Sequence, residues 1–289
     1  MLGVDWGTSN RRAYLVERGG RCLRRHTDGE GMLAVGGNFA ASLAALRTTM
    51  QVGAAVPVVM SGMVGSSSGW QQVPYLDLGT SLADLAQHLV PVAGHPDCLI
   101  VPGFCTRDEG VDVMRGEETQ LLGALALGVG DGWVVLPGTH SKWALLRAGR
   151  IERFATYMTG ELFSMLAAGG TLAPMLKDGA DDGIGFSAGI AQARLARPLS
   201  QSLFGARARV VAGDMAAAQA RSFVSGLLIG TEFASSGFAA GAAVVIIGSP
   251  ALGEHYASAA RLFGIVSTVL DSDAVYCAAL QQFFMKALS

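Results

Sequence analysis

The residues best suited to chemistry stand in the first ten positions, MLGVDWGTSN. A short apolar run over 2–4 brings Asp5 to the end of a predicted strand, and Gly7 allows the backbone to turn tightly. Thr8 and Ser9 then offer hydroxyl and amide groups, a composition that indicates a phosphate-binding loop. Asp5 is placed to hold a metal ion near the outer phosphates of a nucleotide. The alternative is that Asp-x-Gly-Thr simply ends a strand.

A second turn of the same kind lies near the middle of the chain. We expect a strand at 133–136, the turn PGTHSK at 137–142, and two return strands beyond it. The opening turn is likewise followed by a hairpin, with strands at 12–17 and 21–26. Two hydroxyl-rich glycine turns about half a chain apart predict a duplicated fold whose halves close on one nucleotide. Lys142 adds a cation that could reach a phosphate, although a solvated lysine is the commoner case.

Two adjacent carboxylates, Glu117 and Glu118, fall in the first turn of the helix predicted from VMRGEETQLLGALAL at 113–127. The helix dipole favours ionised carboxylates at this end. The alternative is that both are ordinary glutamates of a helix start.

The remaining pattern alternates strands with helices, which predicts an α/β protein. The loop after the strand at 57–60 carries Met63 and Trp70 and is a candidate wall of the substrate site. The alternative is a loop that only packs on the core. Thr159-Gly160-Glu161 opens a helix with Thr159 as its N-cap. Residues 174–189 form a Gly/Asp-rich connection. The other expected elements are helices at 38–50, 81–89, 162–167, 222–234 and 274–288 and strands at 98–101 and 244–247. The last strand runs into Gly248 and Ser249. Ser249 followed by proline predicts a helix start, and the bare backbone of Gly248 would let adenine approach.

Composition narrows the function. A length of 289 residues favours two domains, and 51% hydrophobic residues supply large cores. The net charge of -2 with no basic stripe argues against nucleic acid as a partner. The apolar stretches are too short for a membrane span.

Four cysteines without CxxC spacing and five histidines without an HxxxH pair predict reduced thiols and no dedicated zinc site. Because no charged leader precedes the first loop, we expect a cytoplasmic location. The sequence leaves a homodimer open.

One competing motif is GSSSG at 65–69, which fits the GxSxG elbow of serine hydrolases with Ser67 as nucleophile. That elbow needs a strand running directly into the turn and a helix directly out of it. Neither is expected here, because several residues separate the strand from the motif and WQQVP is a poor helix start.

With these segments in order, the chain resembles the actin-like, hexokinase-like ATPase superfamily and, within it, the 2-dehydro-3-deoxygalactonokinase family. The match is carried by VDWGTSNRRAYL, VVMSGMVGSSSGW, VMRGEETQLLGA, LPGTHSKW, YMTGEL and SGLLIGTE. The resemblance implies two related actin-like (ribonuclease H-like) domains, at 1–131 and 132–289, with an interdomain ATP cleft and a last helix that packs back on the first domain.

The resemblance also implies roles for single residues. Glu117 occupies the place of the catalytic base that related carbohydrate kinases supply as Asp, and Glu118 is the second choice. Asp5 would lie near Mg2+. The nucleotide would contact Asp5, Gly7, Thr8, Ser9, Gly138, Thr139, His140, Lys142, Gly248 and Ser249. The sugar acid would contact Arg12, Met63, Trp70, Arg115, Thr159 and Glu161.

The activity implied is ATP- and Mg2+-dependent phosphorylation of 2-dehydro-3-deoxy-D-galactonate at O6, in galactonate catabolism. The alternatives are a kinase of another small sugar or sugar acid, such as the gluconate epimer, and a non-enzymatic actin-like ATP-binding module. The sequence does not distinguish the two epimers.

Overall fold

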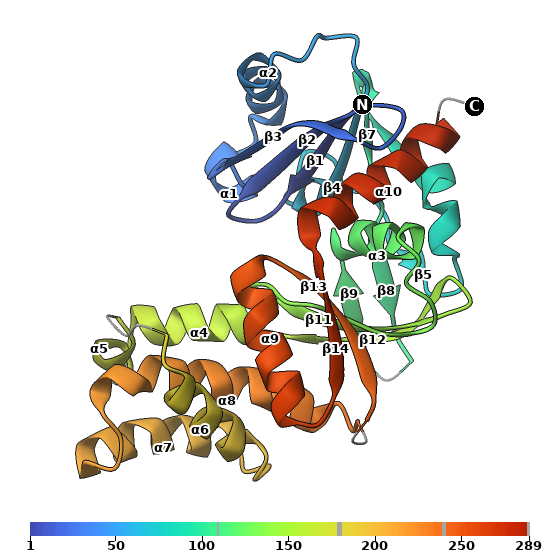
Figure 1. Ribbon diagram of the computed structural model, residues 1–289. Coiled ribbons are helices and arrows are strands. Elements are labelled where there is room, and N and C mark those ends of the chain that lie inside the picture. The colour runs from blue at the N-terminus through green and yellow to red at the C-terminus, as the bar shows by residue number, and fades with distance from the viewer. Residues whose placement is uncertain (109, 178–180, 239–240, 288–289) are drawn as a thin grey trace. The chain divides into compact units, whose positions relative to one another are not determined.

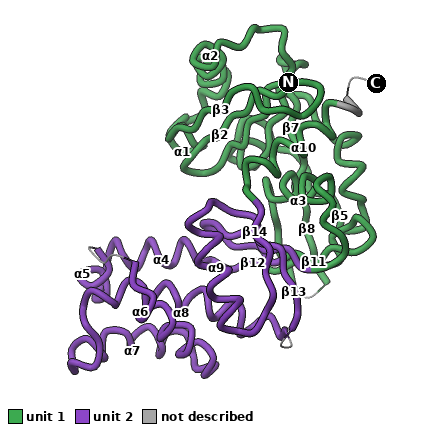
Figure 2. Tube along the Cα trace, viewed as in Figure 1, with its two compact units in different colours: residues 1–132, 144–155, 271–289 green, residues 133–143, 156–270 purple. Residues whose placement is uncertain are grey.

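The chain folds into two compact units, neither of which is a continuous stretch of sequence (Figure 2). The computed structural model describes residues 1–108, 110–177, 181–238 and 241–287. Unit 1 comprises residues 1–132, 144–155 and 271–289, and unit 2 comprises residues 133–143 and 156–270.

The first unit is built on a six-stranded sheet with strand order β3-β2-β1-β4-β7-β6 (Figure 1). Its strands are β1 Leu2–Trp6, β2 Arg11–Val16, β3 Cys22–Asp28, β4 Val58–Gly62, β6 Val90–Val92 and β7 His95–Ile100. A three-stranded sheet contains β5 Leu76–Asp77, β8 Phe104–Thr106 and β9 Asp112–Met114. The helices are α1 Met32–Val35, α2 Phe39–Thr49, α3 Glu117–Ala126 and α10 Ser272–Ala287, with 3-10 helices η1 Met63–Gly65 and η2 Leu82–His88.

The second sheet has five strands in the order β12-β11-β10-β13-β14. They are β10 Gly132–Leu136, β11 Ser141–Arg147, β12 Arg150–Tyr157, β13 Ala243–Gly248 and β14 Val266–Asp271. The helices of unit 2 are α4 Thr159–Ala168, α5 Ala173–Leu176, α6 Gly183–Ala193, α7 Leu199–Ala212, α8 Ala220–Ser235 and α9 Pro250–Leu262, with the 3-10 turn η3 Ala217–Gln219.

The two sheets share one topology. In each sheet, the two strands that follow the first strand in sequence lie on one side of it, and a parallel strand lies on its other side. β1 pairs with β4 in parallel, and β10 pairs with β13 in parallel. The order β3-β2-β1-β4-β7 in the first sheet therefore corresponds to the order β12-β11-β10-β13-β14 in the second. This repetition is the duplication expected from the two glycine turns.

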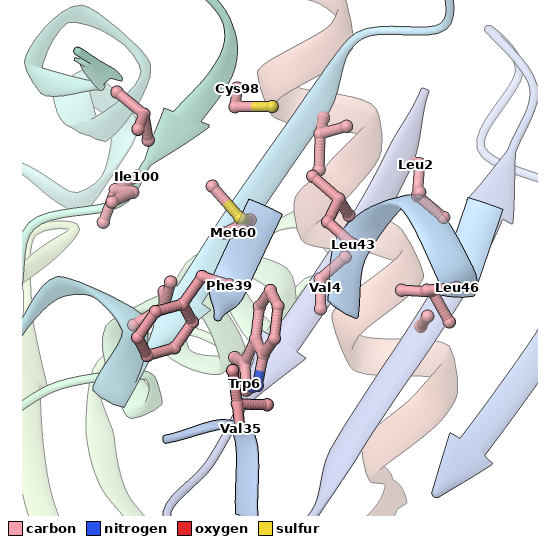
Figure 3. Packing of buried hydrophobic residues seen from close by; sticks show 14 of the residues in the cluster. Leu2, Val4, Trp6, Val35, Phe39, Leu43, Leu46, Met60, Cys98 and Ile100 are labelled. Atoms are coloured by element: carbon pink, nitrogen blue, oxygen red, sulfur yellow. The ribbon is translucent and has the colours of Figure 1, made fainter. Parts of the chain in front are cut away.

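The core of unit 1 follows from two sequence periods. Leu2, Val4 and Trp6 alternate along β1, so they reach the same face of the sheet. Phe39 and Leu43 share one face of α2 at helical spacing and join the same cluster (Figure 3). The Trp6 and Phe39 rings meet edge to face at 5.3 Å. Each large side chain buried in this way contributes about 1.5–3 kcal/mol.

Helix α10 belongs to unit 1 although it follows a strand of the second sheet (Figure 2). Its start is capped by Asp271, whose Oδ1 accepts bonds from the amides of Asp273 (3.1 Å) and Ala274 (2.9 Å). It packs closely on α3, because a Cβ at Gly123 would lie 1.9 Å from the carbonyl oxygen of Val275. Only glycine fits at this crossing.

In unit 2, helices α6 and α8 cross through glycines. A Cβ at Gly189 would lie 2.1 Å from the Phe223 carbonyl oxygen, and one at Gly226 would lie 2.1 Å from that of Phe186. The two backbones therefore approach more closely than any larger residue allows.

The structure differs from the expectations in three places. Residues expected only as a Gly/Asp-rich connection at 174–189 contain α5 and the start of α6. The helix expected at 81–89 is the 3-10 helix η2. Thr159 is not an N-cap but the first residue of α4, which Met158 precedes as the cap. Residues 178–180 of the connection, and 288 of the last helix, lie outside the described residues.

The GSSSG motif does not form a nucleophile elbow. β4 ends at Gly62, and the 3-10 turn η1 separates it from Ser67, which is exposed. The strand-turn-helix geometry that a serine hydrolase requires is therefore missing from this motif. In the described part of the chain, no helix has the length and apolar character needed to cross a membrane.

Candidate functional site

The first glycine turn connects β1 to β2 and is held from behind. The amide of Gly7 donates to the Asn10 carbonyl (3.0 Å), and the Gly7 carbonyl accepts from the amide of Met32 (2.9 Å) at the start of α1. A Cβ at Gly31 would lie 2.3 Å from the carbonyl carbon of Ser9. Thr8, Ser9 and Asn10 are all exposed. The turn thus presents its polar groups outward from a fixed backbone, as a phosphate loop requires.

The second glycine turn, between β10 and β11, is built in the same way. The carbonyl of Thr139 accepts from the amide of Glu161 (3.0 Å) in the first turn of α4. A Cβ at Gly160 would lie 2.4 Å from the Gly138 carbonyl oxygen. His140 Nε2 lies 2.5 Å from Glu161 Oε2, which adds a side-chain tie between the same two segments. Each turn is therefore backed by a glycine at the start of the helix that follows its hairpin.

Asp5 stands at the end of β1 beside two bare backbone segments. Its Oδ2 accepts from Arg12 Nη2 (2.5 Å) and Nε (3.1 Å). Its Oδ1 lies 3.5 Å from the position of a Cβ at Gly62 and 3.9 Å from that at Gly116. Both glycines have positive φ angles, +89° and +114°, that other residues rarely adopt. The backbone therefore leaves space next to one oxygen of Asp5.

The start of α10 surrounds this corner with polar side chains. Tyr14 donates to Asp273 Oδ1 (2.5 Å), and Arg12 Nη1 donates to Ser272 Oγ (3.4 Å). The hydroxyls of Ser61 and Tyr276 are bonded at 2.9 Å in the interior. The neighbours of Asp5 and Arg12 thus depend on residues from the far end of the chain.

Glu117 and Glu118 have different environments. Glu117 is the first residue of α3, is half-buried, and accepts the amide of Arg115 at its Oε2 (3.0 Å). Glu118 is completely buried, and its Oε2 accepts the amide of Gly116 (2.6 Å). Burial, with the nearby Glu117 charge as the next cause, raises the pKa of Glu118 to about 8. Of the two carboxylates, only that of Glu117 is accessible to a substrate.

We expect the change Glu118→Gln to reduce the pH dependence of stability. Because the pKa of Glu118 rises from 4.5 to about 8 on folding, the folded state holds a proton that the unfolded state loses between these values. This contribution is fully present below the unfolded pKa and is lost as the pH rises through the folded one. Each unit of pKa difference corresponds to about 1.4 kcal/mol.

The measurement is the thermal midpoint of wild type and E118Q between about pH 5 and about pH 9. The wild-type midpoint should fall more steeply than that of the variant. Parallel curves would contradict the assignment.

The candidates for sugar-acid contacts divide between the units: Met63, Trp70 and Arg115 lie around η1 and the loop after it in unit 1, whereas Thr159 and Glu161 belong to unit 2. Trp70 stacks on Phe39 with ring centroids 6.1 Å apart, at the edge of the core of unit 1. Met63 lies in η1 and is half-buried. Arg115 places its guanidinium 4.2 Å from the centre of the Tyr75 ring. Its Nη2 donates to a backbone carbonyl, while its Nε and Nη1 are buried and have no hydrogen-bond partner among the described residues.

Unit 2 contains a cavity of about 330 Å³ next to the second turn. Gly138 and Gly160 lie at its edge. Phe186 and His255 line it with rings stacked 5.3 Å apart, a flat surface made of one apolar phenyl ring and one polar imidazole ring. Helices α4, α6, α8 and α9 supply most of its walls (Figure 1). Its size and lining are typical of a site for a small organic ligand with an aromatic ring.

Other residues expected to bind nucleotide lie beside this cavity or away from it. Gly248 ends β13, where a Cβ would be 3.7 Å from Pro137 of the second turn, and Ser249 caps α9. The α9 residues that line the cavity lie further along the helix, from Leu252 to Ser258. Lys142 is buried on β11, and its Nζ donates to Thr156 Oγ1 (2.9 Å). Lys142 is therefore not a solvated surface lysine.

The sequence interpretation missed Glu232, a carboxylate of unit 2 with four side-chain donors. It lies on α8, is 1% exposed, and accepts side-chain bonds from Ser141, Trp143, Thr159 and Tyr256. The available signal was a single charge inside the otherwise apolar helix SFVSGLLIGTEFA. A charge buried in this way needs partners.

Within the described residues, no group of three or more His, Cys, Asp or Glu side chains could hold a metal ion. A magnesium ion that accompanies a nucleotide needs less, because phosphates and waters fill most of its positions. One carboxylate oxygen beside open space, as at Asp5, fits that requirement.

The chain matches the family described as 2-keto-3-deoxy-galactonokinase over residues 5–283. A relative from Rhizobium meliloti (strain 1021), named as a 2-dehydro-3-deoxygalactonokinase, is 36% identical over 280 residues, which cover 93% of this chain and 92% of the relative. The 2-dehydro-3-deoxygalactonokinase of Escherichia coli (strain K12) is 34% identical, with 97% and 96% covered.

Solved structures agree with these matches. A crystal structure of a protein from Sinorhizobium meliloti, also named as a 2-dehydro-3-deoxygalactonokinase, has a TM-score of 0.90 at 35% identity. The match covers 98% of this chain and 95% of that chain. The activator of 2-hydroxyisocaproyl-CoA dehydratase from Clostridium difficile, solved with ADPNP, has a TM-score of 0.53 at 13% identity and covers 100% and 95%. The second likeness shows a shared fold alone.

Proposed function

The chain belongs to the 2-keto-3-deoxy-galactonokinase family, and we propose that it transfers the γ-phosphoryl group of ATP to O6 of 2-dehydro-3-deoxy-D-galactonate. The products are the 6-phosphate and ADP. The observation that carries the proposal is the length of the match, which runs from Asp5 to residue 283 and includes both glycine turns and Glu117. The α/β class and actin-like fold expected from the sequence are confirmed.

The proposal assigns the nucleoside of ATP to the cavity of unit 2. An adenine ring would lie against the flat surface of Phe186 and His255, and the phosphates would leave the cavity at its edge by Gly138. The exposed amides and hydroxyls near Thr139 would hold the phosphate chain. Support comes from the position of the cavity, because Gly138 of the second turn is one of its lining residues.

In unit 1 we assign the outer phosphates to Thr8 and Ser9 and a magnesium ion to Asp5. The ion, when bound, neutralises charge on the phosphate oxygens. Arg12 holds Asp5 in one orientation through two hydrogen bonds. Gly62 and Gly116 keep the space beside Oδ1 open, since a side chain at either position would reduce it.

Glu117 is our choice for the base that takes the proton from O6 of the sugar acid. It begins α3 directly after Gly116, so it lies near the corner that Asp5 occupies. The proton leaves the hydroxyl as the bond from O6 to phosphorus forms, and the phosphoryl group leaves the β-phosphate of ATP. Arg12 and Arg115 remain our candidates for the substrate's carboxylate.

The test is ADP release with ATP, Mg2+ and five acceptors: 2-dehydro-3-deoxygalactonate, its gluconate epimer, galactose, glucose and glycerol. We expect activity with the keto-deoxy acids alone, and the highest kcat/KM with the galacto epimer. A preference for the gluconate epimer would change the substrate and keep the reaction class. If no acceptor increases ADP release while ATP binds, the chain is not a kinase of these sugars.

A further inference from the structure

Glu232 connects four segments of unit 2 through one buried carboxylate. Its Oε2 accepts from Ser141 Oγ (2.8 Å) and from Trp143 Nε1 (2.6 Å), both on β11. Its Oε1 accepts from Tyr256 Oη (2.6 Å) on α9 and from Thr159 Oγ1 at the start of α4. An ionised carboxylate has about four acceptor positions. These four donors therefore use its full capacity.

The four donors are also the residues around the second turn and its cavity. Ser141 directly follows the turn, and Thr159 precedes Gly160, the glycine that backs it. Thr159 and Tyr256 both line the cavity. The turn, the strand leaving it and two cavity walls are thus tied to a single side chain.

The network also fixes the direction of each hydrogen bond. The indole of Trp143 can only donate, and the hydroxyls of Ser141, Thr159 and Tyr256 each donate to a carboxylate oxygen of Glu232. Burial raises the pKa of Glu232, and the hydrogen bonds from the four donors act in the opposite direction. Because the Thr159 proton is already committed, its hydroxyl can only accept a hydrogen bond from a ligand in the cavity.

We propose that Glu232 is a positioning residue that holds the second turn and the nucleoside cavity in one geometry and makes Thr159 an acceptor for a ligand hydroxyl or amino group. Glu232 contacts no substrate itself. The proposal rests on the assignment of ATP to this cavity. It implies that Thr159 binds a donor group of the nucleoside and does not bind phosphate, whose oxygens are acceptors.

The experiment compares Glu232→Gln with Glu254→Gln. Glu254 is an exposed residue of α9, in the same unit, and it accepts a hydrogen bond from Ser258 Oγ (3.2 Å), for which a glutamine keeps an acceptor oxygen. A glutamine amide has two donor positions, so it opposes two of the four donors instead of accepting from them. We expect E232Q to weaken binding of ATP and of adenosine alike by about 10-fold, as measured by calorimetric titration, which is the scale of losing a hydrogen bond to a charged group. E254Q should match wild type.

Steady-state kinetics separate positioning from general damage. KM for ATP should rise in E232Q, while KM for the sugar acid and kcat at saturating ATP stay within about threefold of wild type. Equal changes in both KM values, or unchanged ATP binding, would overturn the proposal. If E232Q does not fold, Thr159→Ser and Thr159→Val give the same test, because Ser keeps the hydroxyl and should bind adenosine as wild type does, whereas Val should not.

These outcomes are distinct from failure of the proposed function. If wild type binds ATP but phosphorylates no sugar acid, the kinase assignment fails and the binding comparison still decides the role of Glu232. If wild type binds neither ATP nor adenosine, both proposals are wrong.

Discussion

We expect the change Glu117→Gln to lower kcat by roughly 100-fold to 10,000-fold, the usual contribution of a positioned general base. Gln has the same shape but accepts no proton, so the O6 hydroxyl keeps its proton as the phosphoryl group arrives. Glu117 belongs to unit 1, whereas the cavity assigned to the nucleoside is lined by residues of unit 2. ATP affinity should therefore change by less than about threefold. The measurements are kcat with 2-dehydro-3-deoxygalactonate and ATP titration of the same preparation.

Glu118→Gln is the matched control, since it makes the same change one residue further along the chain. Glu118 is buried and, with a pKa of about 8, is largely protonated at neutral pH, so Gln resembles the form already present. Its kcat should stay within about threefold of wild type. Near wild-type turnover in E117Q would refute our choice of base, and loss of turnover in E118Q alone would transfer the role to Glu118.

The second large effect concerns stability. Gly226→Ala should lower the free energy of unfolding by about 3 kcal/mol or more, because the new methyl group would lie 2.1 Å from the Phe186 carbonyl oxygen and must push α6 away from α8. The Phe186 atoms that the methyl group would meet all belong to the backbone, so a side-chain rotation cannot relieve the overlap. Urea unfolding at constant m-value measures the loss.

Gly205→Ala provides the control within a neighbouring helix. Gly205 lies inside α7, and a Cβ there has no heavy atom within 4 Å. This substitution should stabilise the protein by up to about 1 kcal/mol, since Ala favours the helix over Gly. If G226A and G205A have the same sign, close packing of α6 on α8 does not govern stability.

The two glycine turns could be predicted because their signals are local. An apolar strand, a glycine and two hydroxyl residues lie within a few positions of one another, and the hairpin strands alternate visibly. The glycines that back the two turns, Gly31 and Gly160, carry a weaker sequence signal. Gly31 is the third residue after β3, and Gly160 is the third residue after β12. This shared offset becomes readable only when the ends of both hairpins are known.

The remaining features depend on contacts between distant residues. Glu117 and Glu118 are identical in type and adjacent, and only the packing of α3 decides which one is buried. Thr159 reads as an N-cap from its neighbours, yet its hydroxyl bonds Glu232, 73 positions away. The glycines at the start of α6 suggested a loop because glycine weakens isolated helices. In the folded protein Gly189, further along α6, permits the close crossing with α8, and this packing offsets that weakness.

The return of α10 to unit 1 sets the order in which the protein can be completed during synthesis. The ribosome makes the strands that carry Asp5 and Arg12 first, then the whole of unit 2, and only afterwards the helix that supplies Ser272, Asp273 and Tyr276. Unit 2 can therefore finish folding while unit 1 still lacks a helix. Every nascent chain carries an uncovered Gly123 face of α3 until its last segment emerges. Unit 1, to which we assign Mg2+ and the catalytic base, therefore starts to fold before unit 2 and is completed after it.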